Sequence, residues 1–416
     1  MKRLRAYKTK LRLNDKERAW CGRCAEASRW CYNWGLGRMI EAYAESRKTS
    51  ASGEKKHLND VKDNIAPWLR EIPYTVLQGA FDNLGAAYAN FFRRVKVGAK
   101  EKGFPKFKER GRSMPSFGLR GNIHITETQI KLPSIGWLRL AEHGYLPTSK
   151  RARILSATVS ERGGDWFVSV QVEEEVAEPI PATGPTLGVD LGIHTLAVVS
   201  DGTRYENIRP LATAHRKIRR LNKELARRTK GGANWRKTKA KINKAHTKVR
   251  YLREHYLHDI SADIIGKKPR ALGAEDLNVK GMQQNRHLAR AISDLGMGEF
   301  RRQLIYKAEW NGTELVLIDT WYPSSKTCSE CGHVRDTLRL SEREFICPNC
   351  GVIIDRDLNA ALNLAAMAAE AVDIANRQNR RGLPGELGCA GHEIDGDAGL
   401  LQAAHREPGR ALQDVA

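Results

Sequence analysis

Residues 187–198 place one acidic residue inside an otherwise apolar run, and this combination strongly limits how the chain can fold. The run is typical of a buried strand, a tight turn that contains Gly192, and a second strand running back. Burying a carboxylate costs free energy unless a cation compensates its charge, and a divalent metal ion commonly does so. We therefore expect Asp190 to bind a metal ion, with partner ligands elsewhere in the chain.

Two further acidic segments supply candidate partners for Asp190. Glu275 and Asp276 end a short apolar segment typical of a strand, and Asp355 and Asp357 begin a helix rich in Ala and Leu. Helix capping alone explains either helix acid, but one can cap while the other points at a metal ion. Acids that converge from separate strands and a helix can hold two Mg2+ ions, which activate water and stabilise the leaving oxygen in phosphodiester cleavage. The sequence therefore predicts a site for two Mg2+ ions built from Asp190, Glu275 and Asp357.

Four cysteines form a second candidate metal site. Two residues separate Cys328 from Cys331 and Cys347 from Cys350, and fifteen residues lie between the two pairs. This spacing is typical of a tetrahedral Zn2+ site with four thiolate ligands. Because the protein fills all four positions, we expect this single Zn2+ to be structural rather than catalytic.

The charge balance points to a polyanionic partner. The 416 residues include 70 Lys and Arg against 48 Asp and Glu, which gives a formal net charge of +22. Nucleic acid is favoured over a membrane, because we find no apolar run long enough to span a bilayer and no signal-peptide pattern. We expect a cytoplasmic protein, associated with the nucleoid when bound to DNA, whose cysteines are thiols or metal ligands.

A long basic segment, residues 215–258, is the first candidate nucleic-acid surface. A break at Gly231 and Gly232 and a thin apolar stripe predict two antiparallel helices with a basic outer face. A solvated charged face is the alternative, but acidic residues for pairing within the helices are nearly absent, which favours contact with a nucleic-acid backbone. The candidate contact residues are Arg219, Arg220, Arg227, Arg228, Lys237 and Lys241.

Two N-terminal segments allow two interpretations each. In residues 100–108, basic residues alternate with aromatic rings, which suits nucleic-acid contact or, equally, a solvated loop that its two rings anchor to the core. The candidates there are Phe104, Lys106, Phe107 and Lys108. Further upstream, Cys21, Cys24 and Cys31 share one face of a predicted helix that begins at residues 14–15. A partial metal site is the alternative there, but without a fourth ligand nearby we expect a buried apolar face.

Several of these motifs together resemble a known family. Residues 188–192, 275–278 and 357–361 resemble the three split motifs of a RuvC nuclease. Residues 322–332 and 347–351 resemble the zinc insert of the TnpB/OrfB proteins of bacterial transposons. These are RNA-guided DNA endonucleases related to the type V CRISPR effectors. The resemblance extends roughly over residues 2–367 and is most specific from residue 188 onward.

The resemblance implies a mixed architecture with α/β, β and α parts. An RNase H-like RuvC nuclease domain carrying a zinc-ribbon insert would follow a β-barrel wedge domain that carries a helical recognition insert. The implied boundaries are 1–12 and 122–182 for the wedge, 13–121 for the recognition part, 183–321 and 355–375 for the nuclease, and 322–354 for the zinc ribbon. Residues 376–416 depart from the family, and their Gly-rich, polar composition predicts a disordered tail. The period-two pattern between residues 123 and 175 agrees with the β-rich part.

The resemblance also implies a function. The protein would act as a monomer on one guide RNA from the transposon end, and cleave double-stranded DNA next to a short transposon-adjacent motif. Arg343 would contact the scissile phosphate, and Tyr74 and Gln78 would help to read the motif. A nuclease-independent RNA-guided repressor and a strand-joining DNA transposase are the alternatives. The three intact acids argue against the repressor, whereas a nuclease fold alone does not exclude the transposase.

Overall fold

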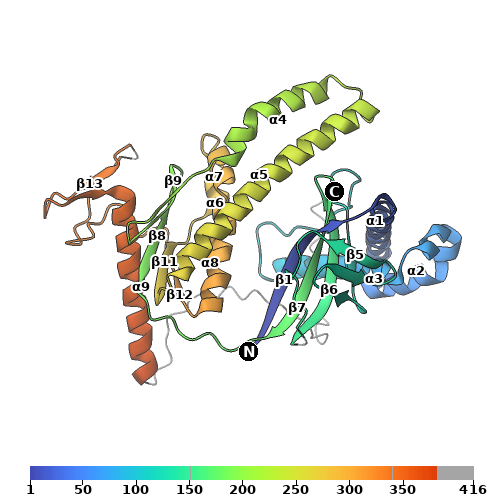
Figure 1. The fold of residues 1–416 in the computed structure, drawn as a ribbon, viewed down its shortest axis with the longest axis horizontal. Helices are drawn as coiled ribbons and strands as arrows, with labels where there is room; N and C mark the ends of the chain where they lie inside the picture. Colours follow the sequence, from blue (N-terminus) through green and yellow to red (C-terminus); the bar gives the residue numbers. More distant parts are fainter. Residues whose placement is uncertain (150, 340, 382–416) are drawn as a thin grey trace.

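The structure is a computed structural model that describes residues 1–149, 151–339 and 341–381. Figure 1 shows two sheets with their own helices, one built from the N-terminal part of the chain and one from the C-terminal part. Strand pairing gives a seven-stranded sheet, a five-stranded sheet and a two-stranded ribbon. The five-stranded sheet carries two of the candidate acids, Asp190 and Glu275.

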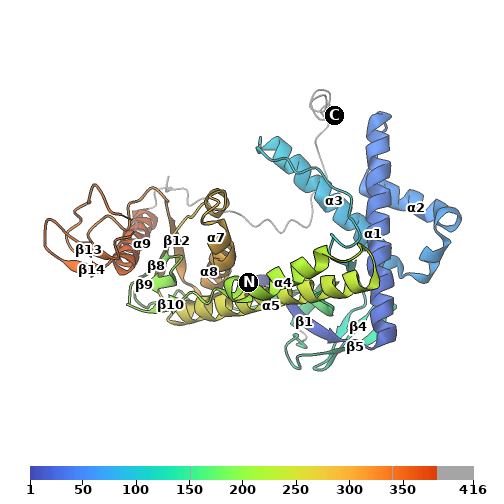
Figure 2. The ribbon, with the colours of Figure 1, turned by 90° about the horizontal axis from the view of Figure 1, so that it is seen from above.

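The N-terminal helices form a group at one end of the molecule (Figure 2) and share one hydrophobic core with the seven-stranded sheet. They are α1 (Asp15–Ala44), α2 (Ala51–Ile65) and α3 (Tyr74–Lys96), with a short 3-10 helix at Pro67–Glu71. The predicted cap of α1 is confirmed: Asn14 accepts from the Glu17 N–H, and the Glu17 carboxylate accepts from the Asn14 N–H. The three cysteines of α1 are fully buried, and burial raises the pKa of each thiol to about 12, so the apolar interpretation is confirmed.

The seven-stranded sheet is antiparallel throughout and follows the order β2-β6-β7-β1-β5-β4-β3. Its strands are β1 (Lys2–Arg12), β2 (Ser116–Leu119), β3 (His124–Ile125), β4 (Gln129–Leu132), β5 (Gly136–Leu140), β6 (Ala152–Arg162) and β7 (Asp165–Glu175). The strands predicted by the period-two pattern are confirmed, and β6 and β7 form a hairpin that turns at residues 162–165. Strand β2 pairs with β6, although residues 116–119 fall inside the predicted helical part. Closure of this sheet into a barrel stays a prediction.

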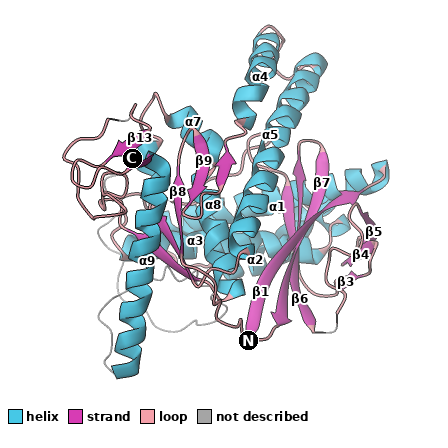
Figure 3. Ribbon diagram, turned by 60° about the vertical axis from the view of Figure 1, so that its left-hand side comes forward, coloured by secondary structure: helices cyan, strands magenta, loops and turns pink. Residues whose placement is uncertain are grey.

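The five-stranded sheet follows the order β10-β9-β8-β11-β12. Its strands are β8 (Leu187–Leu191), β9 (Thr195–Val199), β10 (Arg204–Glu206), β11 (Ala271–Glu275) and β12 (Glu314–Ile318). The first three form an antiparallel meander, and β11 and β12 extend it in parallel on the other side of β8. Helix α9 (Arg356–Arg381) covers one face, and α5 (Ala233–Gly266) and α8 (Met297–Asn311) cover the other (Figure 3).

The basic segment forms the predicted antiparallel helical hairpin. Helices α4 (Pro210–Ala226) and α5 pack along a seam that includes Ile218, Leu221, Ile242 and Val249, all buried. The hairpin projects away from the five-stranded sheet (Figure 1). At its base, the buried Asp294 carboxylate accepts the first N–H groups of α4 and pairs with Arg253 at 3.0 Å. Two short helices, α6 (Val279–Met282) and α7 (Ala289–Leu295), lie between β11 and α8.

Residues 328–355, directly before α9, form the zinc module, which contains a small antiparallel ribbon of β13 (Glu344–Ile346) and β14 (Ile353–Asp355). Helix α9 then runs to Arg381. The predicted start of a disordered tail at residue 376 is therefore wrong, because the helix continues through 376–381. The rest of that tail, with Cys389, lies outside the described residues.

Helix α9 lies unusually close to the sheet. A Cβ atom on Gly188 would sit 2.0 Å from the Ala361 carbonyl oxygen, and one on Gly273 would sit 2.2 Å from the Leu364 carbonyl oxygen. These two glycines face each other in register on the parallel strands β8 and β11. Small residues on the helix complete the fit, because Ala361 and Ala368 are fully buried. The close contact thus needs glycine on the sheet and alanine on the helix.

By length and hydropathy alone, residues Arg356–Arg377 are long and apolar enough to cross a membrane. This segment is α9, however, and it packs against β8, β11 and β12. Its buried Asn359 and Asn363 bond to the segment that leads into the zinc module. These contacts favour a core helix of the five-stranded sheet.

Gly188→Ala tests the close approach of α9. The added Cβ overlaps the Ala361 carbonyl, so we expect the variant to lose about 3 kcal/mol or more of unfolding free energy in urea titrations of the full-length protein. Gly298→Ala is the control, because a Cβ there has no neighbour within 4 Å and the position lies in helix α8, where alanine is favourable. Equal stability of the Gly188 variant and the wild type would contradict the proposed packing.

Candidate active site and zinc site

The sheet places Asp190 and Glu275 side by side. Side chains alternate along a strand, so Asp190 shares the α9-facing side of β8 with Gly188, and Glu275 shares that side of β11 with Gly273. Gly188 pairs with Gly273, and Val189 pairs with Ala274, in the parallel register. Asp190 and Glu275 follow directly at the carboxyl ends of these two adjacent strands. The two strand acids are therefore neighbours on one face.

The third acid comes from the first turn of α9. Asp355 caps this helix, because its Oδ1 accepts the N–H groups of Asp357 and Leu358 at 3.1 and 2.9 Å. Asp355 also pairs with Arg204 of β10 at 3.1 Å. Capping therefore does not account for Asp357, whose carboxylate lies in the electrostatic field of Asp190.

The electrostatics of the site show that the three acids act on one another. The pKa of Asp190 is raised to about 8, first because the carboxyl is buried and then because the charges of Glu275 and Asp357 repel its ionised form. The three half-buried acids at two strand ends and a helix start offer a set of oxygen donors that a cation would neutralise. Such a set fits hard divalent cations, of which Mg2+ and Mn2+ are typical, and these residues therefore fit the predicted metal.

Arg356 is a site residue that sequence reasoning missed. Its guanidinium donates to Asp357 Oδ1 at 3.1 Å and to the Glu342 carbonyl at 3.1 Å, and its charge counteracts the rise in the pKa of Asp190. Arg343, which the resemblance had suggested, is exposed and directly precedes β13. Its carbonyl accepts from the Arg356 N–H at 2.8 Å, so the two arginines are neighbours along the ribbon. The one sequence signal that could have identified Arg356 is its position directly before Asp357.

Ser324 is a second residue that sequence reasoning missed. Its hydroxyl donates to Glu275 Oε1 at 2.6 Å, and the side chain is buried. Ser324 lies 49 positions further along the chain, in the turn that leads from β12 to the zinc module. No periodicity or spacing signal links two residues so far apart, because the contact depends on how β12 pairs with β11.

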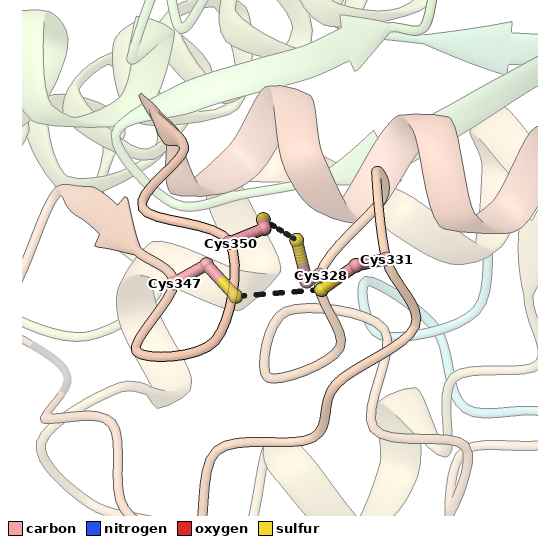
Figure 4. A group of neighbouring side chains, drawn as sticks. All are labelled: Cys328, Cys331, Cys347 and Cys350. Carbon is pink, nitrogen blue, oxygen red and sulfur yellow. Dashed lines mark hydrogen bonds between the residues drawn. The ribbon is translucent and has the colours of Figure 1, made fainter.

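The four cysteines converge as their spacing predicted (Figure 4). All four sulfur atoms lie within 4.8 Å of one another, and the Cys328–Cys350 and Cys331–Cys347 Sγ pairs are each 3.6 Å apart. Tetrahedral Zn–S bonds of about 2.3 Å place ligand sulfurs about 3.8 Å apart, so the cluster has the right size for Zn2+. The Asn349 amide and the His333 N–H lower the pKa of Cys331 to about 6, which favours the thiolate that binds zinc.

The hairpin presents its candidate residues to solvent. Arg228 pairs with Glu224 at 2.5 Å and is half-buried. The other five predicted contact residues are exposed, and no ion pair is found for them among the described residues: Arg219, Arg220, Arg227, Lys237 and Lys241. Unpaired exposed charge of one sign is suited to phosphate contact.

In the loop after α3, some residues are anchored to the core and others are exposed to solvent, so each interpretation fits part of the loop. Phe104 packs edge-on against Tyr88 and Phe91, whereas Phe107 is 54% exposed. Lys106 is exposed. Lys108 lies 4.0 Å from the centre of the Tyr32 ring, and burial lowers its pKa, so it belongs partly to the core.

The two residues suggested to read a flanking motif lie at the start of α3. Tyr74 is exposed and Gln78 is half-buried. They are one helical turn apart, so both can contribute to one surface.

A further basic and aromatic surface lies between the two sheets. A groove of about 730 Å3 opens between β1, α5 and α8. Its lining includes Arg5, Lys8, Tyr145, His258, Tyr306, Lys307 and Trp310. Cations beside partly exposed rings suit single-stranded nucleic acid, where charge contacts phosphates and rings stack on bases.

Three segments of the chain match family models, and its fold resembles that of a solved structure. Residues 298–364 match a family model described as the Cas12f1-like TNB domain, and residues 167–286 match the OrfB model described as "Probable transposase". Residues 1–48 match a helix-turn-helix domain of OrfB proteins, although here they fold as strand β1 and helix α1. A solved Cas12f1–sgRNA–target DNA complex has a similar fold, with a TM-score of 0.51 over 84% of this chain and 82% of that one, at 16% identity.

Full-length relatives complete the assignment. A Streptomyces pristinaespiralis protein, whose name describes an RNA-guided DNA endonuclease, is 35% identical over 90% of this chain and 92% of its own length. InsQ of Escherichia coli K12, with a name of the same kind, is 32% identical over 92% of this chain and 97% of its own. The fold is thus that of a Cas12f-like protein with mixed sheets and helices and a zinc-ribbon-like module. The chain belongs to the TnpB/OrfB family of transposon proteins.

Cys328→Ser tests the zinc site. Loss of one thiolate should lower the zinc content well below one ion per chain and locally unfold the module, because binding and folding are coupled in such sites. Elemental analysis of the purified protein gives the zinc content. Cys21→Ala is the control, since Cys21 lies in the core of α1 and its loss should leave the zinc content unchanged. A zinc-free wild-type protein contradicts the assignment.

The raised pKa of Asp190 predicts that the free energy of unfolding depends on pH. The prediction applies to protein that retains its zinc and has no added Mg2+. Between pH 4 and 8 the folded state holds a proton on Asp190 that the unfolded state has lost. The free energy of unfolding should therefore fall as pH rises through this range, by up to about 1.4 kcal/mol per pH unit. Urea titrations should show that Asp190→Asn removes this part of the slope and that Mg2+ restores stability near pH 8. Equal slopes for both proteins would contradict the raised pKa.

Proposed function

We propose that this protein is a Mg2+-dependent, RNA-guided endonuclease that cleaves double-stranded DNA. The observation that carries the proposal is that Asp190 and Glu275 end two adjacent parallel strands, β8 and β11, and that the charges of Glu275 and Asp357 both act on Asp190. All three acids are present in this chain, and its relatives bear names of RNA-guided DNA endonucleases. The presence of all three acids disfavours a binding-only repressor. The OrfB model is described as a probable transposase, but the full-length relatives are named as endonucleases, which favours cleavage over strand joining.

We further propose the domain division that the resemblance implied. Residues 183–321 and 355–375 would form an RNase H-like RuvC domain, and 322–354 its zinc-ribbon insert. The antiparallel meander extended by two parallel strands supports the first assignment. Residues 1–12 and 122–182 would form the wedge, with 13–121 as the recognition part, although β2 at 116–119 pairs with the wedge sheet.

The chemistry would follow from the acids. Asp190, Glu275 and Asp357 would hold two Mg2+ ions, which supply activation of the attacking water and stabilisation of the departing oxygen. The protein fixes the acids on rigid elements, two strand ends and a capped helix start, so that they need little reorganisation when DNA binds. Arg356, held between Asp357 and the Glu342 carbonyl, and the exposed Arg343 are the proposed cations for the scissile phosphate.

Nucleic acids would occupy the basic surfaces. The exposed cations of the α4–α5 hairpin and the groove between β1, α5 and α8 would contact RNA or DNA backbones. Guide pairing would choose the target, and Tyr74 and Gln78 at the start of α3 would help to read the flanking motif. The protein would work as a monomer on one guide RNA. The Cas12f1 complex of similar fold holds an sgRNA and target DNA, which supports RNA and DNA as partners here.

The first experiment is to purify the protein from cells that carry its native locus and to sequence the RNA that co-purifies. An abundant RNA with a constant part and a variable 3′ segment would define the guide. Its matching duplex then serves as the cleavage substrate. Random RNA fragments alone would contradict the guide proposal.

Asp190→Ala tests the catalytic site on that substrate. Cleavage should fall by about a thousandfold or more, since bound ions supply several kcal/mol of transition-state stabilisation, while RNA and DNA binding stay nearly unchanged. Asp276→Ala is the matched control, because Asp276 adjoins Glu275 but is exposed and pairs with Arg301. Retained cutting by the Asp190 variant would falsify the site.

A further inference from the structure

The turn between β12 and the zinc module is a compact strap, which we define as residues 322–328. The Pro323 carbonyl accepts the N–H groups of Lys326 and Thr327 at 2.9 and 3.0 Å, and also the Thr327 hydroxyl at 2.9 Å. The strap ends at the zinc ligand Cys328, which is buried. Its backbone therefore forms a hydrogen-bonded turn directly before the four-cysteine cluster.

Helix α9 holds the strap in place through two buried asparagines. The Asn363 amide donates to the carbonyls of Ser324 and Thr327, each at 2.7 Å. The Asn359 amide donates to the Thr327 carbonyl at 2.7 Å and accepts the Ser329 N–H at 3.0 Å. Both asparagines are at most 5% exposed, and hydrogen bonds so shielded from water are strong and hold their geometry.

The strap in turn fixes Glu275. The Ser324 hydroxyl donates to Glu275 Oε1 at 2.6 Å, a short hydrogen bond of the kind formed to a charged carboxylate. This bond orients the carboxylate without engaging its second oxygen. Hydrogen bonds of this type from outside the ligand set orient metal ligands in many sites, and their loss commonly weakens metal binding by about 10–100-fold.

We propose that Ser324 is a positioning residue for Glu275, and that the zinc module, through the strap, sets the affinity of the acid site for divalent metal ions. The proposal rests on the proposed role of Glu275 as a metal ligand. It gives the four-cysteine cluster a role in the active site in addition to folding its own module. The zinc ligand Cys328 is connected to Glu275 through the backbone of the strap and the Ser324 hydroxyl.

The test is Mn2+ binding, followed by electron paramagnetic resonance, to full-length zinc-loaded protein free of nucleic acid. Ser324→Ala should weaken Mn2+ binding about 10–100-fold with an unchanged zinc content. Ser324→Thr keeps the hydroxyl and should recover most of the affinity. Ser329→Ala is the matched control, because Ser329 directly follows the strap and its hydroxyl has no hydrogen-bond partner among the described residues. Unchanged Mn2+ affinity in Ser324→Ala would overturn the proposal.

A double-mutant cycle separates this proposal from the function on which it rests. Glu275→Gln should weaken Mn2+ binding by itself, and adding Ser324→Ala should then have little further effect, because Ser324 acts through Glu275. An additive double variant overturns the positioning role while leaving the acid site intact. Normal Mn2+ binding by Glu275→Gln would instead overturn the proposed acid site. Cys328→Ser should lower Mn2+ affinity as Ser324→Ala does, and normal affinity there would overturn the link to zinc.

Discussion

The close packing of helix α9 on the five-stranded sheet is the constraint on which the rest of this molecule depends. Gly188 and Gly273 remove the side chains that would keep the helix backbone away, and the alanines of α9 fill the space that remains. Only at this distance does the first turn of α9 bring Asp357 to the strand ends that carry Asp190 and Glu275. A sheet glycine two residues before each strand acid is thus part of the geometry of the proposed active site as well as of the core.

This packing brings like charges together, which opposes folding. The pKa of Asp190 is raised first because its carboxyl group is buried, and then because the negative charges of Glu275 and Asp357 repel its ionised form. Arg356 compensates part of the charge through its bond to Asp357, and the Ser324 hydroxyl stabilises the Glu275 carboxylate by donating to it. A site that needs cations in this way is less stable without them, so metal affinity and local stability are linked.

Much of this could be predicted from local patterns. An acid inside an apolar run, paired cysteines and a basic segment interrupted by two glycines each carry their own signal, and the strand with Asp190, the zinc cluster and the hairpin follow from them. The contacts of Ser324 and Arg356 were missed because they depend on which elements become neighbours in the fold. Helix α9 runs past residue 376, the predicted start of the tail, because the polar residues there carry no signal for the end of a helix. Strand β2 was missed because its place in the sheet depends on pairing with β6, about forty residues away, which no local pattern shows.

The position of the zinc module in the chain accounts for the proposed influence of its structural Zn2+ on the proposed Mg2+ site. The module leaves the sheet after β12, the neighbour of the strand that carries Glu275, and returns through β14 directly into the cap and first turn of α9, where Asp357 lies. Both ends of the module are therefore attached beside the acids. Ordering it with Zn2+ restrains Asp357 through the chain and Glu275 through Ser324, and disorder would release both acids together.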